Sequence, residues 1–147
     1  MTRNVALSAA VVGAVGSLVA IVALPWADYG DIAVPLSRFP GWGLYVGSVV
    51  ALHACVVWAV LARTARQPLT LAAVAVLSLV AVGSAILLLL GYDDASALFS
   101  GAVPTVVARP GLGGIVAVLA ILVSAGAAAV SGAGRRTTAV APAQARP

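Results

Sequence analysis

The sequence predicts an all-α membrane protein, a bundle of four transmembrane helices with the N and C termini in the cytoplasm. Hydrophobic residues make up 63% of the 147 residues and charged residues only 8%. A soluble domain keeps roughly a quarter of its residues charged. The apolar residues also gather into runs close to the ~20 residues that a helix needs to cross a bilayer. Composition and pattern therefore predict the same fold class.

Four apolar runs define the expected helices, at about 5–24, 43–62, 69–90 and 112–130. None of the runs contains Asp or Arg, and a Pro lies just outside each one, where a missing N–H costs least. The first run is longer than the apolar core of a signal peptide, so we expect it to be retained. We expect a transmembrane domain over residues 1–131 and a disordered cytoplasmic tail over 132–147.

The distribution of Arg predicts the orientation in the membrane. Six of the eight Arg residues flank one side of the expected bundle. All four Asp residues and the remaining two Arg residues, Arg38 and Arg109, fall on the other side. Cytoplasmic loops carry the excess of positive charge, so the first side is assigned to the cytoplasm and the protein to the bacterial plasma membrane. The Arg residues form no basic patch, which argues against a nucleic-acid partner.

The aromatic residues are one-sided as well. Seven of the eight lie in or beside the two outer loops, whereas ordinary aromatic belts occupy both interfaces. We expect the outer loops to form a small cap, with β-prone residues 32–34 and 105–108 pairing across the loops. Exposed aromatic side chains are common binding anchors, and the predicted partner-binding set is Trp26, Tyr29, Phe39, Trp42, Tyr92 and Phe99.

The four outer acids, Asp28, Asp31, Asp93 and Asp94, allow two interpretations. Carboxylate oxygens are ligands for Ca²⁺ or Mg²⁺, but the spacing of a known calcium loop is absent. Asp31 or Asp93 could instead pair with Arg38 or Arg109 and close the loops together. We expect no metal site and no cofactor.

Small residues recur every four positions in the second apolar run. Such a face lets another helix backbone approach closely, so we predict helix packing through Gly43, Gly47, Ala51, Cys55 and Ala59. The first run repeats the device with Ala9, Gly13 and Ser17. The fourth run repeats it with Ala120, Ser124, Ala128 and Gly132, where chance in an Ala-rich segment is an equal explanation.

His53 lies near the centre of the second run, and an ionisable group at the midplane is a functional candidate. It could ligate haem or carry a proton, but the chain has no second His. The alternative is a neutral ring hydrogen-bonded to a backbone carbonyl or to a serine, with Ser17 and Ser84 as the candidates. We expect the second role.

The sequence carries no recognisable catalytic set. Paired carboxylates can do acid–base work, but GxSxG, HExxH, GxGxxG and P-loop motifs are all absent. The single Cys55 excludes an intramolecular disulfide and a cysteine metal site.

Two short motifs carry a family resemblance: Leu24-Pro25-Trp26 before the first outer loop, and Pro110-Gly111-Leu112-Gly113 before the last helix. With these motifs and this topology, the chain resembles small actinobacterial four-helix membrane proteins, including the tryptophan-biosynthesis-associated membrane proteins. The resemblance implies a four-helix membrane fold, and it provides no established catalytic residues to carry over to this chain.

Three functions remain open from the sequence. The first is a non-enzymatic accessory or assembly subunit that binds a larger integral membrane complex, with homo-oligomers also possible. The second is a small transporter or channel subunit, for which His53 and a few serines would have to line the path. The third is an enzyme that acts on lipid at the outer face through its Asp residues.

Overall fold

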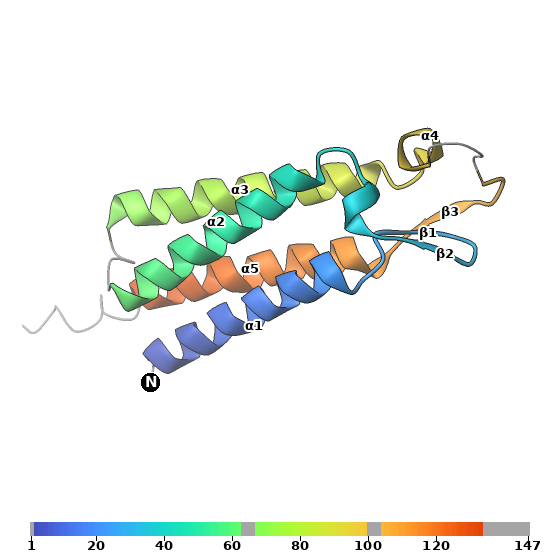
Figure 1. Cartoon of the computed structure of the whole chain (residues 1–147). Helices are drawn as coiled ribbons and strands as arrows, with labels where there is room; N and C mark the ends of the chain where they lie inside the picture. Colours follow the sequence, from blue (N-terminus) through green and yellow to red (C-terminus); the bar gives the residue numbers. More distant parts are fainter. Residues whose placement is uncertain (1, 63–66, 100–103, 134–147) are drawn as a thin grey trace, which may run out of the picture.

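The computed structural model describes residues 2–62, 67–99 and 104–133. Four long helices pack together, and a small sheet lies at one end of the bundle (Figure 1). Each helix contains a stretch long and apolar enough to cross a membrane, which suggests a multi-pass membrane protein and confirms the predicted four-helix architecture. The long helices are α1 (Thr2–Val22), α2 (Trp42–Leu61), α3 (Pro68–Leu90) and α5 (Leu112–Ala133).

Local chemistry explains where two of these helices begin. Pro68 occupies the first turn of α3, where its missing N–H has no intrahelical acceptor to lose. Gly41 precedes α2 with a φ of 80°, a left-handed conformation that glycine adopts at little cost. At the other end of the chain, α5 continues to Ala133, into the segment expected to be tail. Residues 134–147, like the Arg63–Arg66 connection, lie outside the described residues.

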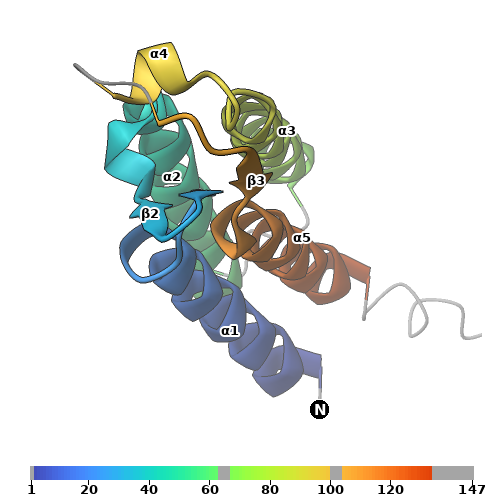
Figure 2. The ribbon, with the colours of Figure 1, turned by 90° about the vertical axis from the view of Figure 1, so that its right-hand side faces the viewer.

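The most extensive helix contact joins α1 to α5, the first and last helices in the chain. Small residues face each other there, and Gly13, Ala120, Ser124 and Ala128 are all buried. A Cβ added at Gly13 would collide with the Ser124 side chain and lie 2.8 Å from the Ala120 carbonyl oxygen. The small residues of the fourth run therefore serve packing. Viewed along the bundle, α1 and α5 form one side while α2 and α3 form the other (Figure 2).

A three-stranded antiparallel sheet caps the bundle, with strand order β2-β1-β3. Gly30, with a φ of 63°, lies in the turn between β1 and β2, where hairpins require a positive φ. In the centre of the sheet, Asp28 of β1 lies opposite Ala33 of β2 and Arg109 of β3. The strands are β1 (Ala27–Tyr29), β2 (Ile32–Val34) and β3 (Ala108–Pro110).

The predicted pairing of residues 32–34 with 105–108 is wrong. β1 lies between the two segments, and β3 begins only at Ala108. The physical reason is the tight turn after Tyr29, which makes β1 the direct hairpin partner of β2 and leaves the opposite edge of β1 for β3. The short helices η1 (Leu36–Arg38) and α4 (Ala95–Leu98) complete the fold.

We predict that Gly13→Ala destabilises the bundle, because the new methyl group forces α1 away from the Ala120 backbone. Overpacking of this kind costs about 1–3 kcal/mol. The measurement is the thermal unfolding midpoint of the protein in detergent micelles. Gly126→Ala is the matched control on α5, since a Cβ there meets nothing within 4 Å. An equal midpoint for both variants would contradict the close α1–α5 contact.

Candidate functional site

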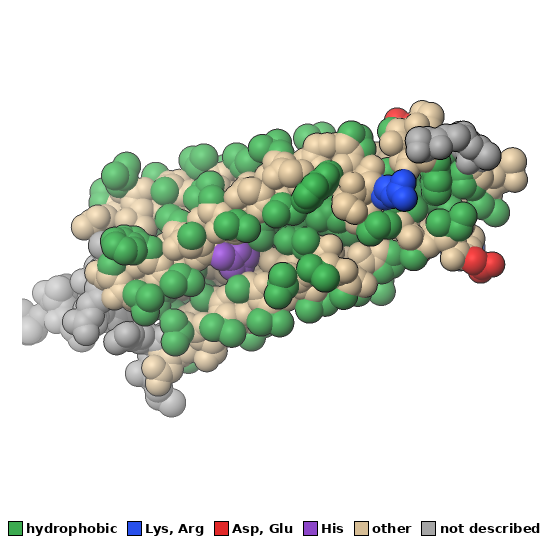
Figure 3. Space-filling view, viewed as in Figure 1, with side chains coloured by type: hydrophobic (Ala, Val, Ile, Leu, Met, Phe, Trp, Pro, Cys, Tyr) green, Lys and Arg blue, Asp and Glu red, His purple; other side chains and the backbone are tan. Residues whose placement is uncertain are grey.

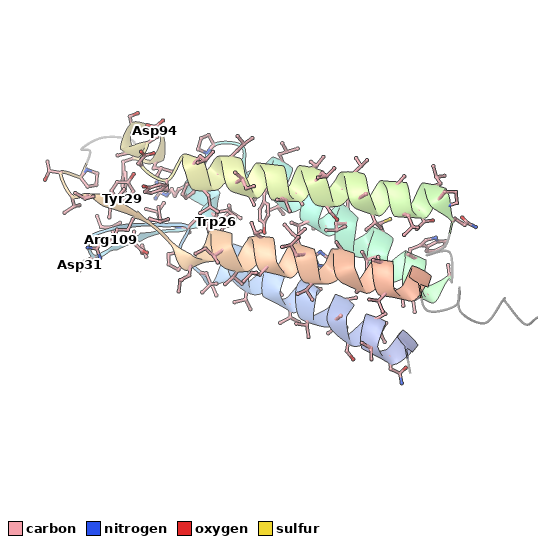
Figure 4. The ribbon with its side chains drawn as sticks, turned by 180° about the vertical axis from the view of Figure 1, so that it is seen from behind. Trp26, Tyr29, Asp31, Asp94 and Arg109 are labelled. Atoms are coloured by element: carbon pink, nitrogen blue, oxygen red, sulfur yellow. The ribbon has the colours of Figure 1, made fainter. Side chains whose placement is uncertain are left out.

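The candidate site is the cap, defined as residues 24–41, 91–99 and 104–111. Figure 4 shows Trp26 where the cap meets the helices, Tyr29 below α4, and Asp31 and Arg109 near the far tip. The cap combines segments from both outer loops, as expected. Its position on the bundle is set chiefly by Trp26.

Trp26 is fully buried, and its indole nitrogen donates a 2.8 Å hydrogen bond to the Ala20 carbonyl at the end of α1. The backbone around it is tied to the start of α5. Gly111 N–H donates to the Trp26 carbonyl at 3.0 Å, and Gly113 N–H donates to the Pro25 carbonyl at 2.8 Å. A Cβ at Gly113 would lie only 2.6 Å from the indole Cδ1. The two motifs singled out in the sequence are therefore in direct contact, and the glycines make room for the tryptophan.

Two aromatic clusters fill the cap and its base. In the first, the Trp26 ring packs 6.3 Å from Phe39 and 5.1 Å from Tyr45, centroid to centroid, and all three side chains are buried. In the second, Tyr29 meets Phe99 edge-to-face at 5.1 Å. Edge-to-face pairs add about 0.5–1.5 kcal/mol to the burial of their area. The second cluster joins the first outer loop to the second.

The Tyr29 hydroxyl strengthens the same junction by donating a 2.8 Å hydrogen bond to the Tyr92 carbonyl. Burial raises the pKa of Tyr29, and the nearby carboxylates of Asp93 and Asp94 raise it further. Both effects disfavour a phenolate at this position. The phenol therefore stays protonated and keeps donating across the two loops.

This geometry corrects the predicted partner-binding set. Trp26, Tyr29 and Phe39 are at most 2% exposed, so they belong to the interior and cannot serve as surface anchors. Of the other three, Trp42 is 42% exposed, while Tyr92 and Phe99 are half-buried. A binding role for these three remains a prediction.

The charged residues do not close the loops as expected. Among the described residues, no Arg nitrogen comes within 4.0 Å of an Asp oxygen. Asp94 instead caps α4, accepting hydrogen bonds from the Ser96 hydroxyl at 2.6 Å and from the Ala97 N–H at 3.2 Å. The Ser96 bond, with the Ala97 bond second, holds the pKa of Asp94 below its usual value. The described part of the chain also contains no group of three His, Cys, Asp or Glu side chains that could hold a metal ion.

The structure places His53 within hydrogen-bonding distance of a backbone carbonyl and a serine, the kinds of partner that the sequence favoured, although the serine is a different one. Its Nδ1 lies 2.8 Å from the Val49 carbonyl oxygen, and its Nε2 lies 2.9 Å from the hydroxyl of Ser124 on α5. Because a carbonyl only accepts, Nδ1 carries the hydrogen in the neutral ring and Nε2 is an acceptor. The single hydroxyl hydrogen of Ser124 then has two acceptors, Nε2 of His53 and the Ala120 carbonyl oxygen at 3.0 Å. Figure 3 shows the half-buried histidine in purple between neighbouring helices, partway along the bundle.

The two serines proposed as partners of His53 are placed elsewhere. Ser84 donates to the Ala81 carbonyl at 3.0 Å, within its own helix. The Ser17 hydroxyl is buried without a hydrogen-bond partner among the described residues, as is the Tyr45 hydroxyl. The sequence did contain a signal for Ser124, which belongs to the small-residue face of α5. What it lacked was the information that α5, and not α3, approaches this side of α2.

The small-residue face of α2 is largely unused within the chain. A Cβ at Gly43 or Gly47 would meet nothing within 4 Å, and Ala51 is exposed. Cys55 is half-buried, and only Ala59 is fully buried. Residues four apart are displaced by about 40° around a helix of 3.6 residues per turn, so the five positions wind from the outer face towards the bundle. The five positions therefore do not form a single packing face within the chain: the first three lie on the outer surface of α2, and only the last two approach the other helices.

No family model, curated protein or solved structure matches this chain. The function proposed below is therefore inferred from the geometry of the chain itself.

We predict that alkaline pH loosens the cap through Tyr29. A raised pKa means that the stabilisation from the protonated phenol is complete below the usual tyrosine pKa of about 10 and is lost as pH rises through the higher folded value. Near-ultraviolet circular dichroism of the purified protein should show this loss. Tyr29→Phe should remove that part of the pH dependence. Tyr92→Phe should retain it, because the acceptor is the backbone carbonyl of Tyr92. Identical curves for the two variants would exclude the Tyr29 bond as the cause.

Proposed function

We propose that the protein is a non-enzymatic accessory subunit that binds a larger integral membrane protein in the bacterial plasma membrane. The observation that carries the proposal is the contrast between two faces of small residues. On α1, Gly13 is fully used by close contact with α5. On α2, Gly43 and Gly47 form an equally narrow face that no part of the described chain covers.

A narrow helix face has a specific use in a membrane. Lipid tails are as apolar as leucine side chains, so close backbone approach and van der Waals packing drive helix association there. The outer face of α2 offers such an approach over Gly43, Gly47 and Ala51. Trp42, at the start of the same helix, is exposed at 42% and lies next to this face. A transmembrane helix of the partner is the occupant that this geometry favours.

The hydrogen bonds of two polar side chains, His53 in α2 and the exposed Asp94 in the cap, support the same class of function. His53 is satisfied by Val49 and Ser124, and Asp94 by the cap of α4. These side chains stabilise the subunit itself. The surfaces left over are apolar helix faces and the cap, which suit assembly with another protein.

The proposed orientation places both termini and the α2–α3 connection in the cytoplasm and the cap outside. Reporter-enzyme fusions in cells test it directly. A fusion after Gln67, between α2 and α3, should give a cytoplasmic signal, and a fusion at Ser37 in the cap should give an external one. The bias of six Arg residues against two motivates this expectation. An external signal at Gln67 would reverse the assignment.

We predict that Gly47→Leu abolishes copurification of the partner from native membranes solubilised in mild detergent. The leucine separates two backbones that must be close, and a loss of tenfold or more in recovered partner is expected. Since nothing in the chain lies within 4 Å of a Cβ at Gly47, the variant should keep its own unfolding midpoint.

Gly126→Leu is the matched control, because Gly126 is an equally open glycine on α5. It should leave recovery of the partner unchanged. If the two variants recover equal amounts of the partner, α2 is excluded as the docking face. Recovery of a second copy of this chain, with no other protein, would replace the accessory role by self-association.

A further inference from the structure

A groove on the cap lies between the edge of the sheet and α4. It is open, has a volume of about 190 Å³, and is lined by residues 32–35, Arg38, Leu98 and Phe99. Its floor is apolar, since Val34 and Leu98 are 3% exposed, and Arg38 is its only charged lining residue. It is separate from the uncovered face of α2.

One wall of the groove is the backbone of an edge strand. The strand order β2-β1-β3 leaves β2 with a neighbour on one side only, among the described strands. Ala33 is exposed, and Ile32 is 48% exposed. The free side of an edge strand offers backbone N–H and C=O groups to an added strand. Pro35 ends the available edge, because proline has no N–H to contribute, so only a short stretch of added backbone can pair.

The charge in the groove is uncompensated. No carboxylate in the described residues lies within 4.0 Å of the Arg38 guanidinium. Asp94 is committed to the cap of α4, and Asp28 and Asp31 line a different cleft, together with Arg109. A guanidinium next to an apolar floor favours an occupant that carries a carboxylate.

We propose that this groove binds an extended, acidic segment of a partner protein, which pairs with β2 as an additional strand and places a carboxylate on Arg38. The inference rests on the proposed function in one respect, that the segment comes from the partner. It adds where on the cap the partner is recognised and by what chemistry.

A second copy of this chain does not fit the same groove. The strands extend from the end of the bundle roughly along its long axis (Figure 1). Antiparallel pairing of β2 with its own copy needs a two-fold axis perpendicular to the strand, which would place the second bundle beyond the cap and outside the membrane. Two copies that share the orientation proposed above lie parallel to each other in the membrane. A lipid is also a poor fit, because it has no backbone to pair with the strand edge.

The test uses three labelled synthetic peptides and the purified full-length protein in micelles, with fluorescence anisotropy as the readout. The first peptide alternates valine and threonine and carries glutamate at both ends. The second has lysine in place of glutamate. The third repeats the acidic sequence with alternate backbone amides methylated, so that it cannot pair as a strand. We expect the acidic peptide to bind about tenfold more tightly than the lysine peptide and the methylated peptide to bind no better than the lysine one.

Two variants assign the effect to the groove. Arg38→Gln should reduce the preference for the acidic peptide to less than about twofold, and Arg109→Gln, on the other side of the cap, should leave it at about tenfold. Equal binding of acidic and lysine peptides to the unaltered protein would overturn the proposal, as would equal loss in the two Arg variants. Binding of the methylated peptide at full strength, or no binding of any peptide up to about 1 mM, would overturn it as well.

The experiments distinguish failure of the groove proposal from failure of the proposed docking face on α2. Peptide binding involves no transmembrane partner, so Gly47→Leu should bind the acidic peptide normally. If the protein binds the peptide but never copurifies with another protein, the groove proposal is supported and the accessory role is contradicted. If the protein copurifies with a partner through α2 but binds none of the peptides, the accessory role is supported and the groove proposal is contradicted.

Discussion

The indole of Trp26 lies where α1 ends, α2 begins and α5 starts, and it contacts all three. It donates to the Ala20 carbonyl, packs edge-on against Tyr45 and sits directly over Gly113. Removing a buried aromatic ring of this size costs about 3–5 kcal/mol in proteins generally. The hairpin of the cap follows immediately after Trp26 in the chain. The position of the sheet, and of the groove beside it, therefore depends on how this one ring is seated.

The glycines at the start of α5 are the other half of that constraint. Gly111 and Gly113 lie against the backbone and ring of Pro25-Trp26, where any side chain would overlap existing atoms. The sequence showed these residues as a helix entry, which they are. The sequence could not show that these glycines at the start of the helix also pack against Trp26, which is distant in the chain. Close approach between distant segments is a tertiary property, and a glycine alone does not identify its neighbour.

The helices could be predicted from the sequence because length and hydropathy are local properties and the bilayer sets their scale. The sheet was harder, since strands as short as Ala27–Tyr29 carry almost no periodic signal, and Asp28 at the centre made this strand look like loop. For the small residues of α1 the sequence predicted packing, whereas for those of α5 it left chance as an equal explanation, and the structure places both sets at the α1–α5 contact. On α2 the same spacing was read as one face, although steps of four residues drift around the helix, and the structure separates Gly47 from Ala59 accordingly. The hydrogen-bonded character of His53 was predictable from the absence of a second ligand, whereas its partner depended on which helices are neighbours.

The contact between α1 and α5 also sets the order in which the protein can assemble. α1 is synthesised before the other three long helices, and α5, with which it makes its most extensive contact, is synthesised after them. Until α5 enters the membrane, Gly13 lacks the helix that covers it, and the Pro25 and Trp26 carbonyls lack the N–H donors of Gly113 and Gly111. The hairpin of β1 and β2 can form early, but β3 and the seat of Trp26 arrive only with the final segment. A chain interrupted before α5 would therefore leave the Pro25 and Trp26 carbonyls without these donors and the small-residue surface of α1 without its covering helix.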